Sequence, residues 1–282
     1  MAESRRVLIT GGTKGLGFAL ARGFLEAGCR VFITGRNIDT ARKAAANLAN
    51  ELAAEAGVVT PAGAATPEGA VFAGAGDSGV WEDNVRLASE AVAAMGGIDI
   101  WVNNAGVNQG GGMVWELSPE VMETVLRTDL LGPMLGAKAA FDAMRQSGGW
   151  LWFVEGHGSD GRIMAGLSAY GTAKRGLGYL WRALAIEARS AGSKIKVGAV
   201  SPGIMITDFT MGALSKMDGE DRKRTTAVFN ILGDRPETVA AFLVPRMLAA
   251  RANGVRIAWL GGAKIAWRFM TASIVKRRVI EY

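Results

Sequence analysis

The sequence predicts an α/β fold with one doubly wound parallel sheet of about seven strands and helices on both faces. Short β-branched and apolar runs alternate with segments of helical periodicity along almost the whole chain. Parallel neighbours in a sheet need such crossover connections. Glycines cluster just after the apolar runs, where strands turn into helices. The 282 residues suit a single domain with extensions.

In the first part of the chain, strands and helices take turns. Residues 7–9 read Val-Leu-Ile and end in glycines, which is typical of a buried strand entering a turn. Residues 18–27 have helical spacing and stop at a glycine, and residues 31–34 predict the second strand. Residues 41–55 are rich in alanine, the strongest helix former. Residues 58–69 hold two prolines with several glycines and threonines, which indicates a loop insertion.

The middle of the chain repeats this alternation. Residues 71–73 predict the third strand, and residues 81–95 predict a helix that two glycines close. Residues 98–102 predict the fourth strand. Serine, proline and glutamate then follow one another, as at the start of a helix, so we expect one long helix from residue 118 to about 146.

The last elements complete the expected sheet. Residues 150–154 predict the fifth strand, residues 167–190 a helix and residues 195–200 the sixth strand. Residues 255–260 predict the seventh. No internal repeat and no second domain is visible.

Positive charge collects at the C-terminal end. The net charge is +6, and residues 251–282 account for all of it. This placement argues against a general nucleic-acid-binding surface. We expect a domain of residues 1–262 followed by a basic, partly amphipathic extension of residues 263–282. The extension either docks on an anionic membrane surface or packs on the body or a second subunit, because its apolar residues have helical spacing: Trp267, Met270 and Ile274.

Single copies of two residue types exclude some kinds of site. Cys29 is the one cysteine, so no intrachain disulfide can form, and His157 is the one histidine, so no His-based metal cluster is expected. No apolar run approaches the ~18 residues of a membrane span. The N-terminus lacks the core of a signal peptide, and a plastid transit peptide is either absent or already removed.

Residues 10–17, Thr-Gly-Gly-Thr-Lys-Gly-Leu-Gly, join the first strand to the first helix. Glycines permit a tight turn there and let backbone N–H groups approach a pyrophosphate at the helix N-terminus. We therefore expect a dinucleotide site of the Rossmann-like kind.

The end of the second strand indicates which dinucleotide binds. Many NAD-binding folds place a carboxylate here to accept the ribose 2′-OH. This chain has Gly35 followed by Arg36, with Lys14 nearby in the glycine loop. A guanidinium suits a 2′-phosphate dianion, so we expect NADP(H) and not NAD.

Tyr170 and Lys174 lie four residues apart on a predicted helix, so they share a face. A free tyrosine has a pKa near ~10, and a neighbouring ammonium favours the phenolate and lowers that pKa. Tyr170 can then act as the general acid that protonates an alkoxide formed by hydride transfer to a carbonyl.

These motifs, with the Asn-Asn-Ala-Gly and Ser-Pro-Gly runs that end at residues 106 and 203, resemble those of the short-chain dehydrogenase/reductase family over residues 5–262. The resemblance implies that Asp77 binds the adenine, Asn104 lines the cofactor pocket, Lys174 binds the nicotinamide ribose and Thr207 contacts the nicotinamide amide. The full set of expected cofactor-binding residues is Gly11, Thr13, Lys14, Gly15, Leu16, Gly17, Arg36, Asp77, Asn104, Ala105, Gly106, Tyr170, Lys174, Pro202, Gly203 and Thr207.

Two positions depart from the pattern of that family. The usual catalytic serine, thirteen residues before the tyrosine, is here His157, and the nearest hydroxyl belongs to Ser159. We expect Ser159 to be the donor to the substrate carbonyl, with His157 as its rival. The usual asparagine of the preceding helix is Asp129, which we count among the catalytic residues because its backbone carbonyl can still support a proton-relay water.

The C-terminal half resembles the chlorophyll b reductases, which reduce a 7-formyl group to a hydroxymethyl with NADPH. The similarity covers residues 98–106, 229–240 and 243–247, the loop ending at Ser159, and the tail with Trp267 and the Arg277-Arg278 pair. A large apolar substrate also suits the segment after Gly203, although ordinary helix packing would use the same residues: Ile204, Met205, Ile206, Phe209, Met211, Leu214, Met217 and Phe229.

The sequence therefore predicts an NADPH-dependent carbonyl reductase, with chlorophyll(ide) b as the expected substrate and Tyr170 as the general acid. An NADPH reductase of another bulky aldehyde or ketone is the alternative, and a non-catalytic NADP-binding scaffold is a third reading. The resemblance further implies a homo-oligomer. We expect the stromal face of the thylakoid in a photosynthetic eukaryote and the cytoplasm otherwise.

Overall fold

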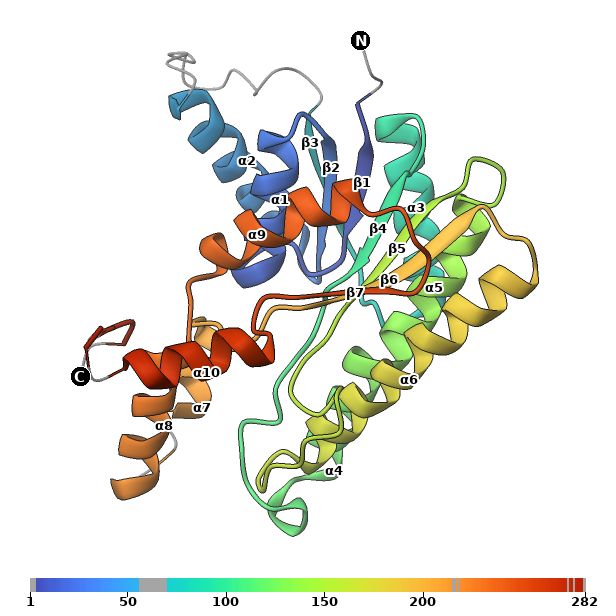
Figure 1. Ribbon diagram of the computed structural model, residues 1–282. Helices are drawn as coiled ribbons and strands as arrows, with labels where there is room; N and C mark the ends of the chain where they lie inside the picture. The colour runs from blue at the N-terminus through green and yellow to red at the C-terminus, as the bar shows by residue number, and fades with distance from the viewer. Residues whose placement is uncertain are drawn as a thin grey trace.

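The computed structural model describes residues 4–55, 70–214, 217, 219–272, 274–275 and 277–280. These residues form a parallel seven-stranded sheet in the order β3-β2-β1-β4-β5-β6-β7 (Figure 1). The predicted fold class is thereby confirmed. The strands are β1 (Arg6–Ile9), β2 (Arg30–Gly35), β3 (Val71–Ala75), β4 (Ile100–Asn103), β5 (Gly149–Val154), β6 (Ile195–Ser201) and β7 (Val255–Ala258).

Helices cover both faces of the sheet and create two apolar cores. One core joins the sheet to α1 (Gly15–Glu26), α2 (Ile38–Glu55) and α9 (Pro236–Ala249). The other joins it to α3 (Trp81–Met95), α5 (Gly132–Ala143) and α6 (Ser168–Ser190). Successive residues of the central strand β1 enter opposite cores, because side chains alternate along a strand: Val7 and Ile9 pack on the first core, and Leu8 on the second.

The helix expected from residue 118 to about 146 is present as continuous helical backbone from Pro119 to Ala143, with a π-helical turn inside it. After the short 3₁₀ turn η1 (Val114–Glu116), α4 (Pro119–Leu126) begins with Ser118 as its cap, whose hydroxyl accepts the Val121 N–H. A π-helical turn, η2 (Arg127–Leu131), then precedes α5. The sequence does not reveal this turn, because contacts with residues far away in the chain stabilise it. The loop predicted at residues 58–69 lies outside the described residues.

Some of the helices that follow β6 lie to one side of the sheet (Figure 1). They comprise α7 (Asp208–Leu214), α8 (Gly219–Leu232) and α10 (Gly262–Thr271). Helix α10 contains Trp267 and Met270, as the helical spacing in the tail predicted, and ends before Ile274. Within the described part of the chain, no helix has the length and apolarity needed to cross a bilayer.

Candidate active site

The predicted site residues meet at the carboxyl edge of the sheet. All seven strands are parallel, so the loops that follow them gather at one edge (Figure 1). The glycine loop follows β1, Arg36 follows β2, Asp77 follows β3, Asn104 follows β4, and Ser159 lies in the loop after β5. Pro202, Gly203 and Thr207 come after β6. Tyr170 and Lys174 lie in the first turns of α6.

The glycine loop is built by close backbone approaches. Gly11 has a φ of +65° and lies against Ala105, whose Cα would be 2.8 Å from a Cβ at position 11. Gly17 packs on the Gly11 carbonyl and the Asn104 amide so closely that any side chain would collide. Lys14 precedes the first turn of α1 without a side-chain cap, which leaves the first N–H groups of the helix available to an anion.

Asn104 braces this loop from the end of β4. Its side-chain amide donates to the carbonyl oxygens of Thr10 and Gly11 at 2.9 and 3.0 Å. In return, the Thr10 hydroxyl accepts the backbone N–H groups of Asn104 and Ala105. Thr10 was missed as a site residue because its bracing depends on a strand 90 residues away in the chain.

The end of β2 leaves no room for a carboxylate. A Cβ at Gly35 would lie 2.6 Å from the Thr13 methyl group, so a larger residue would have to push the Thr13 side chain aside. Arg36 and Lys14 are both exposed at this corner, and no described residue forms an ion pair with either. The corner therefore presents two cations to a ligand.

Asp77 is only partly available for the adenine. One carboxylate oxygen accepts the Gly79 N–H at 2.8 Å, and the other lies 3.8 Å from the Arg127 guanidinium. Its side chain remains 40% exposed, so it can still contact a ligand.

Tyr170 and Lys174 form a buried pair. They are 8% and 6% exposed, and the Lys174 ammonium lies 5.6 Å from the centre of the Tyr170 ring. The Tyr170 hydroxyl lies against the backbone of Gly156, where a Cβ would collide with it. Burial raises the pKa of Tyr170, the Asp129 carboxylate raises it further, and the Lys174 charge opposes both.

The two candidates for the third catalytic position share the loop after β5. Ser159 is 1% exposed, and its hydroxyl accepts the Gly156 N–H at 3.1 Å. It therefore lies next to the residue that touches the Tyr170 hydroxyl. His157 Nε2 is buried and has no hydrogen-bond partner among the described residues. Both side chains remain candidates on this geometry.

Two further buried residues lie near the Tyr170–Lys174 pair, and the sequence did not single them out. Gln109 accepts the Tyr170 backbone N–H at 2.9 Å and donates to the Gly166 carbonyl at 2.9 Å, which ties the loop after β4 to the start of α6. Glu155 is 3% exposed and accepts from Trp181 and Arg256. An acidic residue directly after a fully apolar strand was the available signal for Glu155. Gln109 had none, because its partners lie about 60 residues away.

The segment after β6 is tied down by an acidic residue further along the chain. The backbone of Asp234 exchanges hydrogen bonds with Ile204 and Ile206, at 3.0 Å each. Its carboxylate, 5% exposed, accepts from Trp259 at 2.6 Å, Arg268 at 2.7 Å and Arg277 at 2.6 Å. The C-terminal extension is thus anchored on the segment that carries Thr207. Thr207 itself reaches the glycine loop, since its methyl group would lie 3.6 Å from a Cβ at Gly15.

The described residues contain no cluster of three or more His, Cys, Asp or Glu side chains that could hold a metal ion. The chemistry that this arrangement supports is acid–base catalysis by the buried tyrosine beside a dinucleotide site.

Comparisons with known proteins point to one family. The family model of the short chain dehydrogenases matches residues 5–218. A chloroplast protein of Oryza sativa subsp. japonica, named as a probable chlorophyll(ide) b reductase, is 33% identical over 98% of this chain and 54% of its own length. The chlorophyll(ide) b reductase NOL of Arabidopsis thaliana chloroplasts is also 33% identical, over 90% of this chain and 68% of its own. The chain spans about half the length of the first of these relatives.

Solved structures show the same fold. Levodione reductase superposes with a TM-score of 0.78 at 24% identity, covering 93% of this chain and 98% of its own. A 3-ketoacyl-(acyl-carrier-protein) reductase from Brucella melitensis, complexed with NADH, gives a TM-score of 0.74 at 22% identity over 93% and 99% of the two chains. The chain therefore belongs to the short-chain dehydrogenase/reductase family of oxidoreductases, and it is similar to the chlorophyll(ide) b reductases of that family.

Proposed function

We propose that this protein is an NADPH-dependent carbonyl reductase that converts the 7-formyl group of chlorophyll(ide) b to a hydroxymethyl. The observation that carries the proposal is the buried Tyr170–Lys174 pair beside the glycine loop. The 33% identity to chlorophyll(ide) b reductases over most of the chain supports the choice of substrate.

The residues at the carboxyl edge fit NADPH. The bare N-terminus of α1 suits the pyrophosphate, and the missing side chain at Gly35 with the cations of Lys14 and Arg36 suits a 2′-phosphate. When bound, NADPH supplies the hydride. The chain would hold it through the glycine loop, Arg36, Asp77, the Asn104–Gly106 segment, Lys174 and the Pro202–Thr207 segment.

The chain's own contribution is to orient the carbonyl and deliver a proton. Ser159 would donate a hydrogen bond to the carbonyl oxygen, with His157 as the alternative donor. Tyr170 would give its hydroxyl proton to that oxygen as the carbon is reduced. The partly exposed apolar residues after Gly203, among them Met205 and Phe229, would cover a large apolar substrate.

The decisive experiment incubates the purified protein with NADPH and chlorophyllide b or detergent-solubilised chlorophyll b, followed by chromatography of the pigments. We expect a 7-hydroxymethyl product that requires NADPH, is not formed with NADH, and is lost in Tyr170→Phe. NADPH binding without product would exclude the pigment as the substrate. The alternative, a reductase of another bulky aldehyde or ketone, would then remain. If Tyr170→Phe kept full function, the non-catalytic scaffold would be the better reading.

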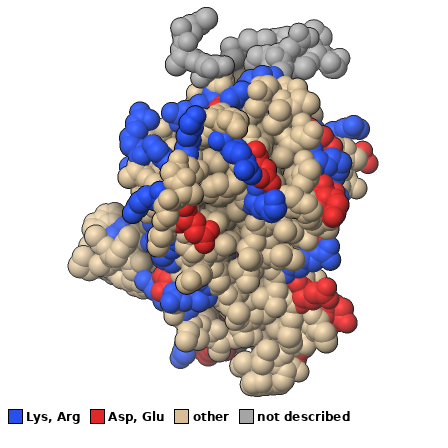
Figure 2. Space-filling model, turned by 90° about the vertical axis from the view of Figure 1, so that its right-hand side faces the viewer, with Lys and Arg blue, Asp and Glu red and all other residues tan. Residues whose placement is uncertain are grey.

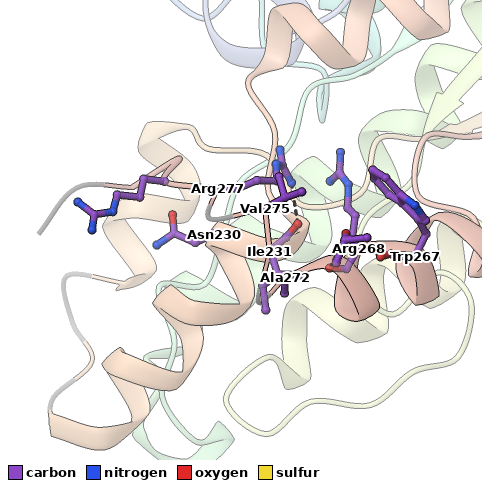
Figure 3. A pocket seen from close by; sticks show the side chains of 9 residues that line it. Asn230, Ile231, Trp267, Arg268, Ala272, Val275 and Arg277 are labelled. Atoms are coloured by element: carbon purple, nitrogen blue, oxygen red, sulfur yellow. Dashed lines mark hydrogen bonds between the residues drawn. The ribbon is translucent and has the colours of Figure 1, made fainter.

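We also propose a peripheral membrane contact through the C-terminal extension. Trp267, Phe269 and Met270 are 56%, 49% and 70% exposed on α10. Beside them lies a pocket of about 510 Å³ between α8, α10 and the C-terminal segment, lined by arginines and apolar side chains (Figure 3). Lys264 lies nearby, and burial together with the positive charges of Arg268 and Arg277 lowers its pKa to about 8. This mixture suits an anionic lipid surface.

We propose that the protein forms a homo-oligomer through the side of the molecule shown in Figure 2. Uncharged surface spreads between the charged groups there. Helices α5 and α6 contribute large exposed apolar side chains, including Met134 on α5 and Tyr179 and Ile186 on α6. With a chlorophyll substrate, the protein's place would be the stromal face of the thylakoid in a photosynthetic eukaryote, and the cytoplasm otherwise.

A further inference from the structure

Asp129 is a completely buried carboxylate that contacts the catalytic pair. It lies in the π turn η2 with 0% of its surface exposed. One carboxylate oxygen accepts the Val107 N–H at 2.7 Å, and the other lies 3.1 Å from the Lys174 ammonium. Lys174 is therefore held by a carboxylate, whereas the neutral asparagine usual at this position of the family could not pair with its charge.

The surrounding backbone makes room for this ion pair. A Cβ at Gly106 would lie 3.1 Å from the Asp129 oxygen and 3.6 Å from the Lys174 ammonium, so glycine keeps the space open. On the other side of η2, Leu130 packs over Gly176 of α6, which fixes the turn against the helix of the catalytic pair. The π turn thus points Asp129 at Lys174 while its neighbour packs on α6.

The ion pair changes what Lys174 does to Tyr170. An unpaired ammonium one helical turn away would favour the phenolate strongly, because the whole pair is buried. A carboxylate beside the ammonium opposes that effect. The remaining ionisable groups nearby are Glu155, whose charge is already matched by Arg256 at 2.7 Å, and His157, next to Gly156. Asp129 is thus the carboxylate in direct contact with Lys174.

We propose that Asp129 is a positioning residue that fixes Lys174 and keeps the proton on Tyr170, so that the site favours carbonyl reduction over alcohol oxidation. Reduction needs a protonated tyrosine as acid, whereas oxidation needs the phenolate as base. The preference for reduction over oxidation rests on the proposed function. The effect of Asp129 on the protonation of Tyr170 is independent of that function, and it can be measured on the protein alone. Burial opposes the charge of Lys174, and Asp129 nevertheless raises the pKa of Lys174, in keeping with this role.

The test follows the phenolate of Tyr170 by its near-ultraviolet absorbance as pH rises. The chain has three tyrosines, so the difference between each protein and its Tyr170→Phe counterpart isolates one group. Asp129→Asn keeps the size of the side chain and an oxygen for Val107 but removes the negative charge. We expect the Tyr170 phenolate to appear at a pH lower by on the order of one unit, because the uncompensated ammonium then stabilises it.

Kinetics supply the second readout. In Asp129→Asn the alkaline fall of kcat/KM for reduction moves to lower pH with the phenolate, and alcohol oxidation gains relative to reduction near neutral pH. Asp142→Asn is the matched control, because this exposed carboxylate on α5 also carries two ion pairs, with Lys138 and Arg145. Asp142→Asn should shift neither the titration of Tyr170 nor the pH profile of kcat/KM. Cooperative unfolding in urea shows whether Asp129→Asn is folded. If it is not, Asp129→Ser provides a second uncharged variant.

An unchanged Tyr170 titration in the folded Asp129 variants would overturn the proposal. That result would not bear on whether the protein is a carbonyl reductase. Conversely, a shifted titration in a protein that reduces no carbonyl would uphold the effect on Tyr170 and defeat the proposed function.

Discussion

At the scale of single residues, Arg36 is the side chain that should separate NADPH from NADH. It is exposed at the end of β2, next to a glycine that has no space for a carboxylate. A charge-assisted contact with a phosphate contributes about 1.5–3 kcal/mol. Arg36→Ala should therefore raise KM for NADPH about 10- to 100-fold and leave KM for NADH unchanged. Steady-state kinetics measure both, with Arg42→Ala on the exposed side of α2 as control. Equal losses with both cofactors would mean that Arg36 does not contact the 2′-phosphate.

Gly156 tests the position of the catalytic hydroxyl. Its α-carbon faces the Tyr170 hydroxyl so closely that a methyl group must displace it. Gly156→Ala should lower kcat by about 10-fold or more and cost about 1–3 kcal/mol of stability from overpacking. NADPH binding, followed by fluorescence, should persist. Gly262→Ala at the start of α10 is the control, because no atom lies within 4 Å of its added methyl. Full activity in Gly156→Ala would show that the Tyr170 hydroxyl can move without loss of catalysis.

At the scale of elements, the positions of the strands along the chain and of the glycine loop were predictable because they depend on local patterns. The strand predicted at residues 7–9 lies in the centre of the sheet, and the turn after it bears the predicted glycines. The π turn that carries Asp129 was not predictable, since its insertion is stabilised by contacts with α6 and Val107 rather than by local sequence.

Asp234 joins the element after β6 to the C-terminal extension, and its ion pairs should depend on pH. Burial opposes its charge, but hydrogen bonds from Arg268 and Trp259 hold the pKa of Asp234 below its usual value. A lowered pKa in the folded state stabilises the protein above the unfolded pKa of about 3.9, and this contribution is lost as pH falls through the folded value. Asp234→Asn leaves Arg268 buried without its carboxylate, which should cost about 3 kcal/mol or more at neutral pH.

Urea unfolding at a series of pH values measures this difference. The gap between wild type and Asp234→Asn should narrow as the medium becomes acidic enough to protonate Asp234. Asp142→Asn is the control, since that carboxylate is 43% exposed and its pairs should contribute about 1 kcal/mol or less. A gap that stays constant with pH would contradict the assignment of the ion pairs to Asp234.

At the scale of the whole molecule, the sequence indicated the glycine loop and the tyrosine–lysine pair, but it did not indicate how the C-terminal extension attaches to the rest of the fold. Tyr170, Lys174 and the glycine loop follow from motifs. The pairing of Asp234 with Arg268 and Arg277 spans 34 and 43 residues and ties the extension to the segment after β6. The sequence showed that the extension was basic and amphipathic, and left open whether it packs on the body or meets a membrane. The anchoring arginines pack on the body, while Trp267, Met270 and Ile274 stay exposed.

This division of the extension into an anchored side and an exposed side leads to a prediction for membrane binding. Exposed apolar residues at a lipid interface contribute by area, and each basic residue near an anionic surface adds about 1 kcal/mol. The protein should sediment with vesicles that contain anionic lipid, less with neutral vesicles, and less as salt rises. Met270→Glu combined with Ile274→Glu should abolish sedimentation without changing activity on a water-soluble carbonyl substrate. Val85→Glu combined with Val92→Glu, an equivalent pair of changes on α3, should sediment like the wild type. Equal sedimentation of the Met270→Glu/Ile274→Glu variant and the wild type would place the membrane contact elsewhere on the protein. If the wild type did not sediment, the exposed side of α10 would instead be expected to contact another copy of the chain.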